Sequence, residues 1–209
     1  MRRVAGGRFI IGAAGFAAAG LFAVLGAAVR GNSTNAVDIA AQAWVLANQY
    51  SWLHDFFRAV TIVGGITAMW IYAVIGAAYL WFRIRHFMAA AVLLAPAITI
   101  GLLEQVKRAY SRPRPAGLGS GVDSSYSFPS AHATTSAAIC CTLAIAFWRE
   151  GLISTRTAIA LSVLPPLLVG LSRLYLNVHW ATDVLGGWSA GLVVAALAGL
   201  LYAAKEPHE

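Results

Sequence analysis

The chain has 209 residues, of which 59% are hydrophobic and only 11% are charged, and its mean hydropathy is +0.71. A water-soluble domain carries about 25% charged residues, so this composition excludes an ordinary soluble protein and predicts an integral membrane protein. The formal net charge is +7. Because most arginines lie at the ends of apolar segments, we interpret this charge as the flanking of membrane helices and expect no nucleic-acid partner.

The N-terminal part of the chain predicts one membrane span and one interfacial helix. The first apolar segment covers about 9–29. It is longer than the about 7–15 apolar residues of a signal-peptide core, so we expect it to stay as an uncleaved helix. A polar loop at 31–35 follows, and an amphipathic stretch then runs to Tyr50. Trp44 within this stretch, Tyr50 at its end and Trp52 just after it favour a position at the membrane–water interface.

Five further apolar segments predict a helical bundle. Together with the first they give an all-α integral membrane protein with six transmembrane helices. Two adjacent prolines, Pro165 and Pro166, are expected to kink the fifth span. No repeat or change of composition divides the chain, so residues 1–209 are predicted to form a single domain. The five later spans cover about 59–82, 88–106, 130–148, 157–175 and 179–203.

Basic residues at the ends of the spans predict the orientation of the bundle. With the N-terminus inside, eight arginines and lysines flank the inner side and seven flank the outer side. Three of the outer residues, Lys107, Arg114 and Arg173, belong to the motifs described below. Without these three, the excess lies on the inner side, which predicts that both termini are cytoplasmic. All three motifs then face outward, on the periplasmic side of a bacterial inner membrane.

The two cysteines of the chain, Cys140 and Cys141, are adjacent within an apolar segment. Adjacent cysteines cannot join distant parts of the chain, and they lack the ligand spacing of a zinc site. We therefore expect both to pack in the core.

The first of three polar motifs places Lys107 and Arg114 at the end of the third span. An arginine fork can bind two phosphate oxygens and a lysine adds a point charge, so this pair suits an anionic phosphate. Pro113 and Pro115 are expected to stiffen the segment that presents Arg114. A juxtamembrane basic patch that holds anionic lipid headgroups is the alternative interpretation.

The second motif, Pro129-Ser130-Ala131-His132, opens the fourth span. Proline and serine are favoured at helix starts, and the free N–H groups there bind anions. Ser130 and the Ala131 amide are therefore candidate phosphate ligands, and His132 is a candidate general acid. An ordinary capped helix with an interfacial histidine is the alternative.

The third motif is Ser172-Arg173, followed by His179 and Asp183. The last two are four residues apart, the spacing that places side chains on one face of a helix. Asp183 would then accept from one imidazole nitrogen and leave the other to attack phosphorus. A Ser-His-Asp hydrolase is disfavoured because the chain shows no α/β pattern. Neighbouring cations disfavour a metal site that includes His132, and a purely structural His–Asp pair stays open.

Taken together, the three motifs resemble the signature of the type 2 phosphatidic acid phosphatase (PAP2) family, the membrane branch of the superfamily that includes vanadium haloperoxidases. Their order, spacing and position between spans match, and the resemblance covers about residues 59–200. The family usually has glycine where this chain has Ala131, which keeps the backbone N–H but loses access to positive φ. The motifs read Lys107-x6-Arg114-Pro115, Pro129-Ser130-Ala131-His132 and Ser172-Arg173-x5-His179-x3-Asp183.

The resemblance implies a role for each polar residue of these motifs. His179 would attack phosphorus and form a phosphohistidine, Asp183 would orient His179, and His132 would protonate the leaving group. Because fixed cations would supply the charge that Mg²⁺ supplies in kinases, no metal and no other cofactor is expected. The phosphate itself would be held by Lys107, Arg114, Arg173, Ser130 and the Ala131 amide.

The resemblance also implies a lipid phosphate or diphosphate as the substrate. We expect undecaprenyl diphosphate, because an outward-facing site suits the recycling of that carrier lipid. Phosphatidate and phosphatidylglycerophosphate are the alternatives. The apolar spans exclude a soluble haloperoxidase. A non-catalytic lipid-binding membrane protein is the alternative from another class, although it would not need His132, His179 and Asp183 together.

Overall fold

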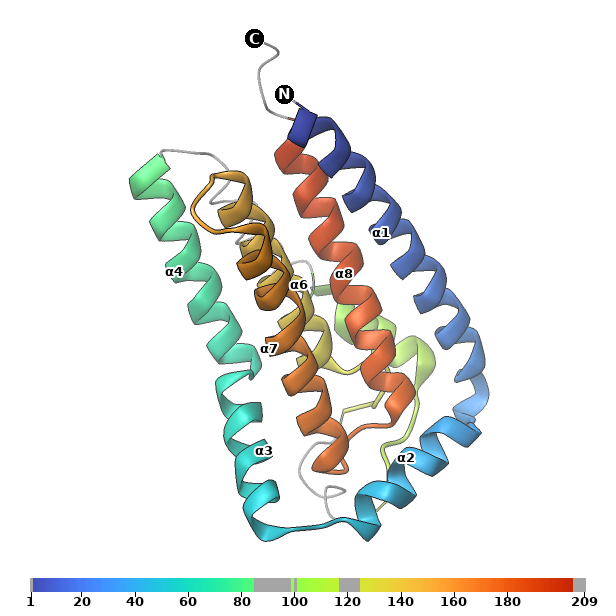
Figure 1. The fold of residues 1–209 in the computed structure, drawn as a ribbon. Helices are drawn as coiled ribbons and strands as arrows, with labels where there is room; N and C mark the ends of the chain where they lie inside the picture. The colour runs from blue at the N-terminus through green and yellow to red at the C-terminus, as the bar shows by residue number, and fades with distance from the viewer. Residues whose placement is uncertain (1, 85–98, 100, 117–124, 205–209) are drawn as a thin grey trace.

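The computed structural model describes residues 2–84, 99, 101–116 and 125–204, and these residues form helices and loops without a strand. The all-α prediction is therefore confirmed for this part of the chain (Figure 1). Residues 101–110 form a further helical segment. The named helices are α1 (Arg2–Ala28), a 3₁₀ turn (Arg30–Asn32), α2 (Ala36–Ala47), α3 (Ser51–Val63), α4 (Ile66–Ile84), α6 (Ala131–Arg149), α7 (Thr155–Tyr175) and α8 (Ala181–Ala204).

Four of these helices, α1, α6, α7 and α8, are long and apolar enough to cross a membrane, and α3 with α4 adds a fifth candidate span. Most of the predicted third span, 88–106, lies outside the described residues, so six spans stay a prediction. Helix α7 runs through Pro165 and Pro166 as one helix. Multiple membrane spans are thus confirmed, by length and composition.

The second predicted span differs from the structure, because it is broken. We expected one helix over about 59–82, whereas α3 ends at Val63, α4 begins at Ile66, and the two are bent by 45°. The break falls at Gly64 and Gly65. A Cβ at Gly64 would lie 2.1 Å from Val169 Cγ2, so only glycine lets α7 pack this closely against the bend. The bend thus lies at a glycine pair against which α7 packs, and the segment contains no proline.

Helix α6 forms the centre of the bundle, and α1 its edge. Of the residues in their apolar windows, 61% are buried in α6 and only 11% in α1. Small residues allow α6 and α8 to approach closely, since a Cβ at Gly191 would lie 2.5 Å from Thr134 O. This close packing fixes the start of α6 beside the start of α8.

The predicted amphipathic helix is confirmed as α2, and its large apolar side chains point outward. Trp44 is 60% exposed, and Val37 and Ile39 are exposed as well, whereas Asp38 is fully buried. In a membrane-embedded protein the surroundings are apolar, so an inverted pattern is expected at such a position. The polar face of α2 therefore joins the interior of the bundle.

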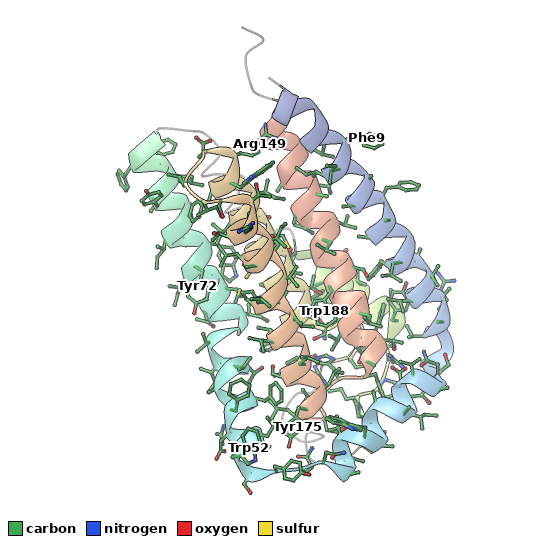
Figure 2. The ribbon with its side chains drawn as sticks, viewed as in Figure 1. Phe9, Trp52, Tyr72, Arg149, Tyr175 and Trp188 are labelled. Atoms are coloured by element: carbon green, nitrogen blue, oxygen red, sulfur yellow. The ribbon has the colours of Figure 1, made fainter. Side chains whose placement is uncertain are left out.

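The two ends of the bundle differ in what they carry. The start of α1 and the end of α8 lie together at one end, whereas α2, the start of α6 and the start of α8 lie at the other (Figure 1). Figure 2 shows Phe9 and Arg149 near the first end and Trp52 and Tyr175 near the second. The start of α1 and the end of α8 thus lie at the end of the bundle opposite the three motifs. Which end faces the cytoplasm stays a prediction.

Candidate functional site

The three motifs meet around one cavity of about 290 Å³ at the second end of the bundle. As predicted, Lys107 and Arg114 of the first motif, Ala131 and His132 of the second, and His179 of the third all contribute to its wall. The wall also includes apolar side chains and one carboxylate, Glu104, which forms an ion pair with Arg108 at 3.3 Å. Its full lining is Ile66, Leu103, Glu104, Lys107, Arg114, Ser125, Ala131, His132 and His179.

His179 lies in the loop before α8 and not on the helix, which corrects the expectation of a shared helical face. Asp183 lies in the first turn of α8, and the two meet because the loop folds back over the helix start. His179 Nδ1 lies 3.4 Å from Asp183 Oδ2, and Trp180 N donates to the same oxygen at 2.9 Å. This backbone contact resembles a capping box, in which an acidic side chain of the first turn caps its own helix.

The second nitrogen of His179 fixes the tautomer. Arg114 Nη1 lies 3.1 Å from His179 Nε2, and a guanidinium can only donate, so Nε2 is the acceptor in this contact. The ring proton therefore resides on Nδ1, where it faces Asp183. Burial lowers the pKa of the imidazole to about 4, and the charges of Arg114 and Arg173 act in the same direction against Asp183. The result is a neutral ring whose lone pair points to the cation side of the site.

The predicted cations are held in place by bonds to the backbone and to hydroxyls. Arg114 donates to Ser125 O at 3.0 Å and to Val178 O at 2.8 Å, which links the 111–116 segment to the loop before α8. Lys107 is buried and donates to Tyr126 O. On α7, Arg173 donates to Thr61 Oγ1 of α3 at 2.7 Å.

Ser130 occupies the N-cap position of α6, but its side chain makes no capping hydrogen bond. Its Oγ is buried and has no hydrogen-bond partner among the described residues. The backbone N–H of Ser130 donates to Asp183 O at 3.0 Å, which ties the start of α6 to the first turn of α8. The amides of the first turn of α6 have no partner within the helix, so this end suits an anion.

His132 lies in the first turn of α6 and is half-buried. A Cβ at Gly65 would lie 3.9 Å from His132 Nε2, so the bend between α3 and α4 borders the imidazole. Ser172, the remaining polar residue of the motifs, donates to Val169 O at 2.6 Å and is buried within α7. Ser172 therefore contributes to the packing of α7 and is not among the residues that line the cavity.

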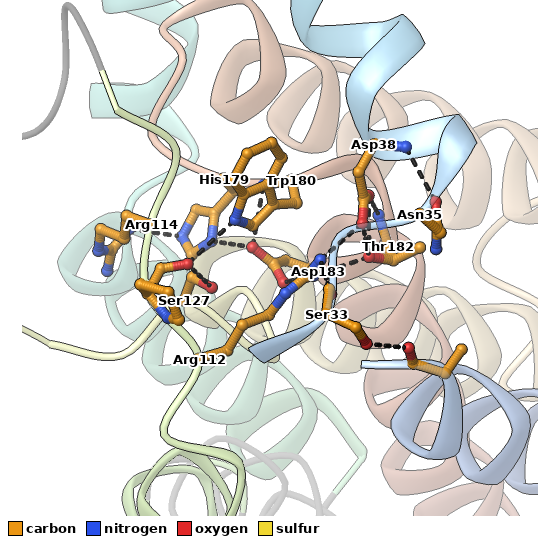
Figure 3. A network of polar contacts seen from close by, with 12 residues as sticks. Ser33, Asn35, Asp38, Arg112, Arg114, Ser127, His179, Trp180, Thr182 and Asp183 are labelled. Carbon is orange, nitrogen blue, oxygen red and sulfur yellow. Dashed lines mark hydrogen bonds and ion pairs between the residues drawn. The ribbon is translucent and has the colours of Figure 1, made fainter. Parts of the chain in front are cut away.

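Two buried charged residues of the site were not predicted. Arg112 and Asp38 are both fully buried, and they join Asp183 in a network that Figure 3 shows from close by. Arg112 lies between the predicted cations Lys107 and Arg114, where the sequence alone does not single it out. Asp38 carries a stronger signal, because it is the one acidic residue of the short amphipathic segment that became α2.

The described residues contain no group of three or more His, Cys, Asp or Glu side chains able to hold a metal ion. Cys140 and Cys141 are free thiols within α6, and Cys141 is buried, as expected for core packing.

Comparisons with known proteins agree with this geometry. A family model, that of the PAP2 superfamily, matches residues 85–206. Phosphatidylglycerophosphatase B of Bacillus subtilis (strain 168) is 28% identical over 176 residues, which are 83% of this chain and 87% of that protein. The crystal structure of a transmembrane PAP2 type phosphatidylglycerolphosphate phosphatase from Bacillus subtilis matches with a TM-score of 0.84 at 25% identity, over 93% of this chain and 98% of that chain.

An all-helical membrane bundle with a cationic, two-histidine cavity at one end defines a membrane phosphatase. Since the family model covers more than half of the sequence, the chain belongs to the PAP2 superfamily. It is a lipid phosphatase that hydrolyses phosphoric esters without a metal ion.

Proposed function

We propose that this enzyme hydrolyses the terminal phosphomonoester of phosphatidylglycerophosphate through a phosphohistidine at His179. The observation that carries the proposal is the cavity lining, which combines cations and two histidines with the apolar side chains Ile66 and Leu103. Such a wall suits an amphiphile whose phosphate enters first. The name of the similar Bacillus subtilis protein and the description of the matching crystal structure support phosphatidylglycerophosphate over the undecaprenyl diphosphate expected from the sequence.

In the first step, His179 Nε2 attacks phosphorus, and a nitrogen–phosphorus bond replaces the bond between phosphorus and the lipid oxygen. The departing oxygen takes a proton from His132. The imidazole becomes positively charged as it is phosphorylated, and the proton on Nδ1 strengthens its bond to Asp183. The long 3.4 Å separation in the substrate-free site is thus expected to shorten in this intermediate.

In the second step, water attacks phosphorus and passes a proton to His132. The nitrogen–phosphorus bond breaks, the lone pair returns to His179 Nε2, and inorganic phosphate leaves. Phosphoryl transfer depends mainly on positioning and charge stabilisation, and Lys107, Arg114 and Arg173 supply the charge. Arg114 already contacts Nε2 and would move its bond to a phosphate oxygen as the substrate enters.

The α6 N-terminus completes the proposed phosphate site. The buried hydroxyl of Ser130 has no partner in the described structure, and a phosphate oxygen would provide one. The Ala131 N–H lies in the same helix start, where amides bind anions. We therefore propose that the Ser130 hydroxyl and the Ala131 N–H bind phosphate oxygens.

The test is phosphate release by detergent-solubilised protein from three lipids: phosphatidylglycerophosphate, phosphatidate and undecaprenyl diphosphate. We expect the highest kcat/KM with phosphatidylglycerophosphate. Orthovanadate should inhibit, because it mimics five-coordinate phosphorus bonded to His179. A higher kcat/KM with undecaprenyl diphosphate would restore the earlier preference and reject the substrate proposed here. Absence of phosphate release from every lipid would reject the enzymatic proposal itself.

We further propose that the site faces outward across a bacterial inner membrane. The support is the excess of basic flanking residues at the end that carries the termini, opposite the cavity. Single cysteines at Ser51, near the cavity end, and Leu152, near the other end, test this. An impermeant thiol reagent on intact cells should label the first and not the second. Labelling of position 152 alone would reverse the orientation.

A further inference from the structure

Two carboxylates and one guanidinium form a buried chain beside the proposed nucleophile. Arg112 Nη2 lies 2.6 Å from Asp38 Oδ2, and Arg112 Nη1 lies 2.6 Å from Asp183 Oδ1. All three side chains are 0% exposed. They come from α2, from the segment after helix 101–110 and from α8, so this chain of charges joins three parts of the molecule (Figure 3).

Asp38 also holds the beginning of α8. Its Oδ1 accepts from Thr182 N at 2.9 Å, and the Thr182 hydroxyl lies 2.9 Å from both carboxylate oxygens. Arg112 Nη1 donates to the same hydroxyl at 2.8 Å. A carboxylate supplied by one helix thus caps the positive end of another. Thr182 precedes Asp183, so this cap fixes the backbone on which Asp183 is mounted.

Arg112 is not arranged to bind phosphate. Its two terminal nitrogens are used by Asp38, Asp183 and Thr182, and Nη2 also donates to Ser33 O at 3.1 Å. It is absent from the cavity lining, whereas Arg114 is part of it. A fully buried guanidinium with these partners acts on other protein groups and not on the substrate.

Stability alone is a poor explanation for such a cluster. The removal of charges from water carries a large desolvation cost, and well-packed apolar residues are often as good or better for stability. A buried ionic network beside a reacting group is better explained by what it holds in place. Here the held group is the Asp183 carboxylate, because one oxygen faces Arg112 and the other faces His179.

His179 lies in a loop, where Arg114 and Asp183 contact the two nitrogens of its ring. Rotation of the Asp183 carboxylate would remove the acceptor from His179 Nδ1 and leave only the contact of Arg114 with Nε2 to oppose the other tautomer. That tautomer carries a proton on Nε2, the atom proposed to attack phosphorus, and is inactive. Arg112 opposes the rotation by engaging Oδ1 with a short, charge-assisted bond.

We propose that Arg112 and Asp38 are positioning residues for phosphoryl transfer, which hold Asp183 ionised and oriented so that His179 presents an unprotonated Nε2. This makes α2 a structural part of the active site. The inference rests on the proposed function, in which His179 is the nucleophile. It assigns to Arg112 a task different from that of Arg114, only two residues away.

The test compares Arg112→Met, Arg112→Lys and Asp38→Asn with the wild type on phosphatidylglycerophosphate. Arg58→Met and Asp55→Asn are matched controls, because both residues are exposed on α3. Loss of the residue that orients a metal ligand typically lowers activity about 10–100-fold, and we expect a loss of the same order in kcat for Arg112→Met, because Arg112 orients a carboxylate in a comparable way. The KM should stay within about threefold, since neither residue touches phosphate. Arg112→Lys should be intermediate, because one ammonium cannot replace a fork that spans two carboxylates.

The double variant Asp38→Asn/Arg112→Met separates positioning from folding. It neutralises Asp38, one of the two buried carboxylates that lose their guanidinium in Arg112→Met, so its thermal stability should exceed that of the single variant. Its kcat should stay low, because Asp183 still lacks Arg112. Recovery of kcat together with stability would overturn the proposal. If Arg112→Met does not fold, thermal stability and kcat are compared between Asp38→Asn and the double variant instead.

A readout that does not require turnover distinguishes this inference from the proposed function. The ¹⁵N chemical shifts of the His179 ring report its tautomer, and they are assigned by the loss of the signals in His179→Gln. We expect the Nδ1-protonated form in the wild type and both controls, and a mixture in Arg112→Met. An unchanged tautomer with kcat within about twofold of the wild type would reject positioning by Arg112. If the wild-type protein is inactive but the tautomers are as expected, the proposed function is rejected and the positioning of His179 by Arg112 stands.

Discussion

The two sides of the cavity hold their histidines in different ways. On the α8 side, His179 is 4% exposed and is bonded to Arg114 and Asp183, which is itself held by buried charges. On the α6 side, His132 is half-buried in the cavity wall, beside the Gly64–Gly65 bend of α3 and α4. Both histidines line the cavity, and the described contacts hold the ring of His179 at both of its nitrogens.

This difference matches the two tasks proposed for the histidines. A nucleophile gains from a fixed direction and a fixed tautomer, because each misplaced orientation lowers the rate of attack. A general acid must follow the leaving oxygen of whichever ester is bound, so it belongs on the side that faces the substrate. The described contacts preorganise the α8 side, where the helix start, the 111–116 segment and α2 converge.

Removal of the nucleophile should have the largest effect. His179→Ala should form neither the phosphoenzyme nor the product, with a loss on the order of 10⁵-fold or more in kcat, as for other catalytic nucleophiles. Activity and acid-labile phosphate on the protein are measured together. His54→Ala, on α3 and outside the cavity lining, is the control and should retain both. Substantial turnover by His179→Ala would remove the covalent mechanism.

Removal of the acid should cost less, and the loss should depend on the leaving group. General acid catalysis contributes about 10²–10⁴-fold, and His132→Ala should lose most of this with an alkyl lipid phosphate. With p-nitrophenyl phosphate the loss should be smaller, because p-nitrophenolate leaves without a proton. The ratio of the two losses is measured in one detergent.

The leaving-group test separates the two sides of the cavity directly. Asp183→Asn should weaken turnover of both substrates to a similar degree, because it disturbs the nucleophile and not the acid. Equal losses on both substrates for His132→Ala would contradict its role as the acid, and would make the two sides functionally alike.

The titration of His179 measures how strongly its side of the cavity is preorganised. Burial lowers the pKa of this imidazole from the ordinary 6.5 to about 4, so the ring should remain neutral between these values while an exposed histidine becomes protonated. The neutral form is the one able to attack, and it is lost only as the pH falls towards 4. NMR of the ring in the substrate-free protein checks this expectation. A midpoint near 6.5 would show that water reaches the ring.

Much of this architecture was predictable from local sequence. Apolar runs with clear ends predicted α6, α7 and α8 to within two residues, because each begins after a polar or proline-containing segment. The convergence of the three motifs followed from their positions at one end of successive spans, and the cavity lining confirms that they meet. The roles of their residues rest on the proposal above.

The features missed are those in which tertiary packing overrides a local pattern. The Gly64–Gly65 pair lies inside an apolar run, and its consequence depends on the approach of Val169 from α7. Spacing of four residues suggested one helix face for His179 and Asp183, but α8 begins only at Ala181, after Trp180, whose N–H donates to Asp183, and His179 stays in the loop. Asp38 was not singled out from the sequence, because its partner Arg112 lies 74 residues along the chain.

The smallest expected effect concerns Ala131, which occupies the position where the family usually has glycine. Ala131 begins α6 and lines the cavity on the His132 side, so Ala131→Gly would remove one methyl group from the wall without altering the backbone N–H. Because the amide that faces the phosphate is kept, kcat/KM should change by no more than about threefold, and thermal stability should fall slightly, since glycine weakens a helix by up to about 1 kcal/mol. Ala133→Gly is the matched control, as Ala133 lies in the same turn but is fully buried and outside the cavity lining. It should lose stability without a change in KM. A tenfold or larger gain in kcat/KM for Ala131→Gly alone would contradict this expectation. It would mean that the Ala131 methyl group holds the α6 side of the cavity in a less active shape.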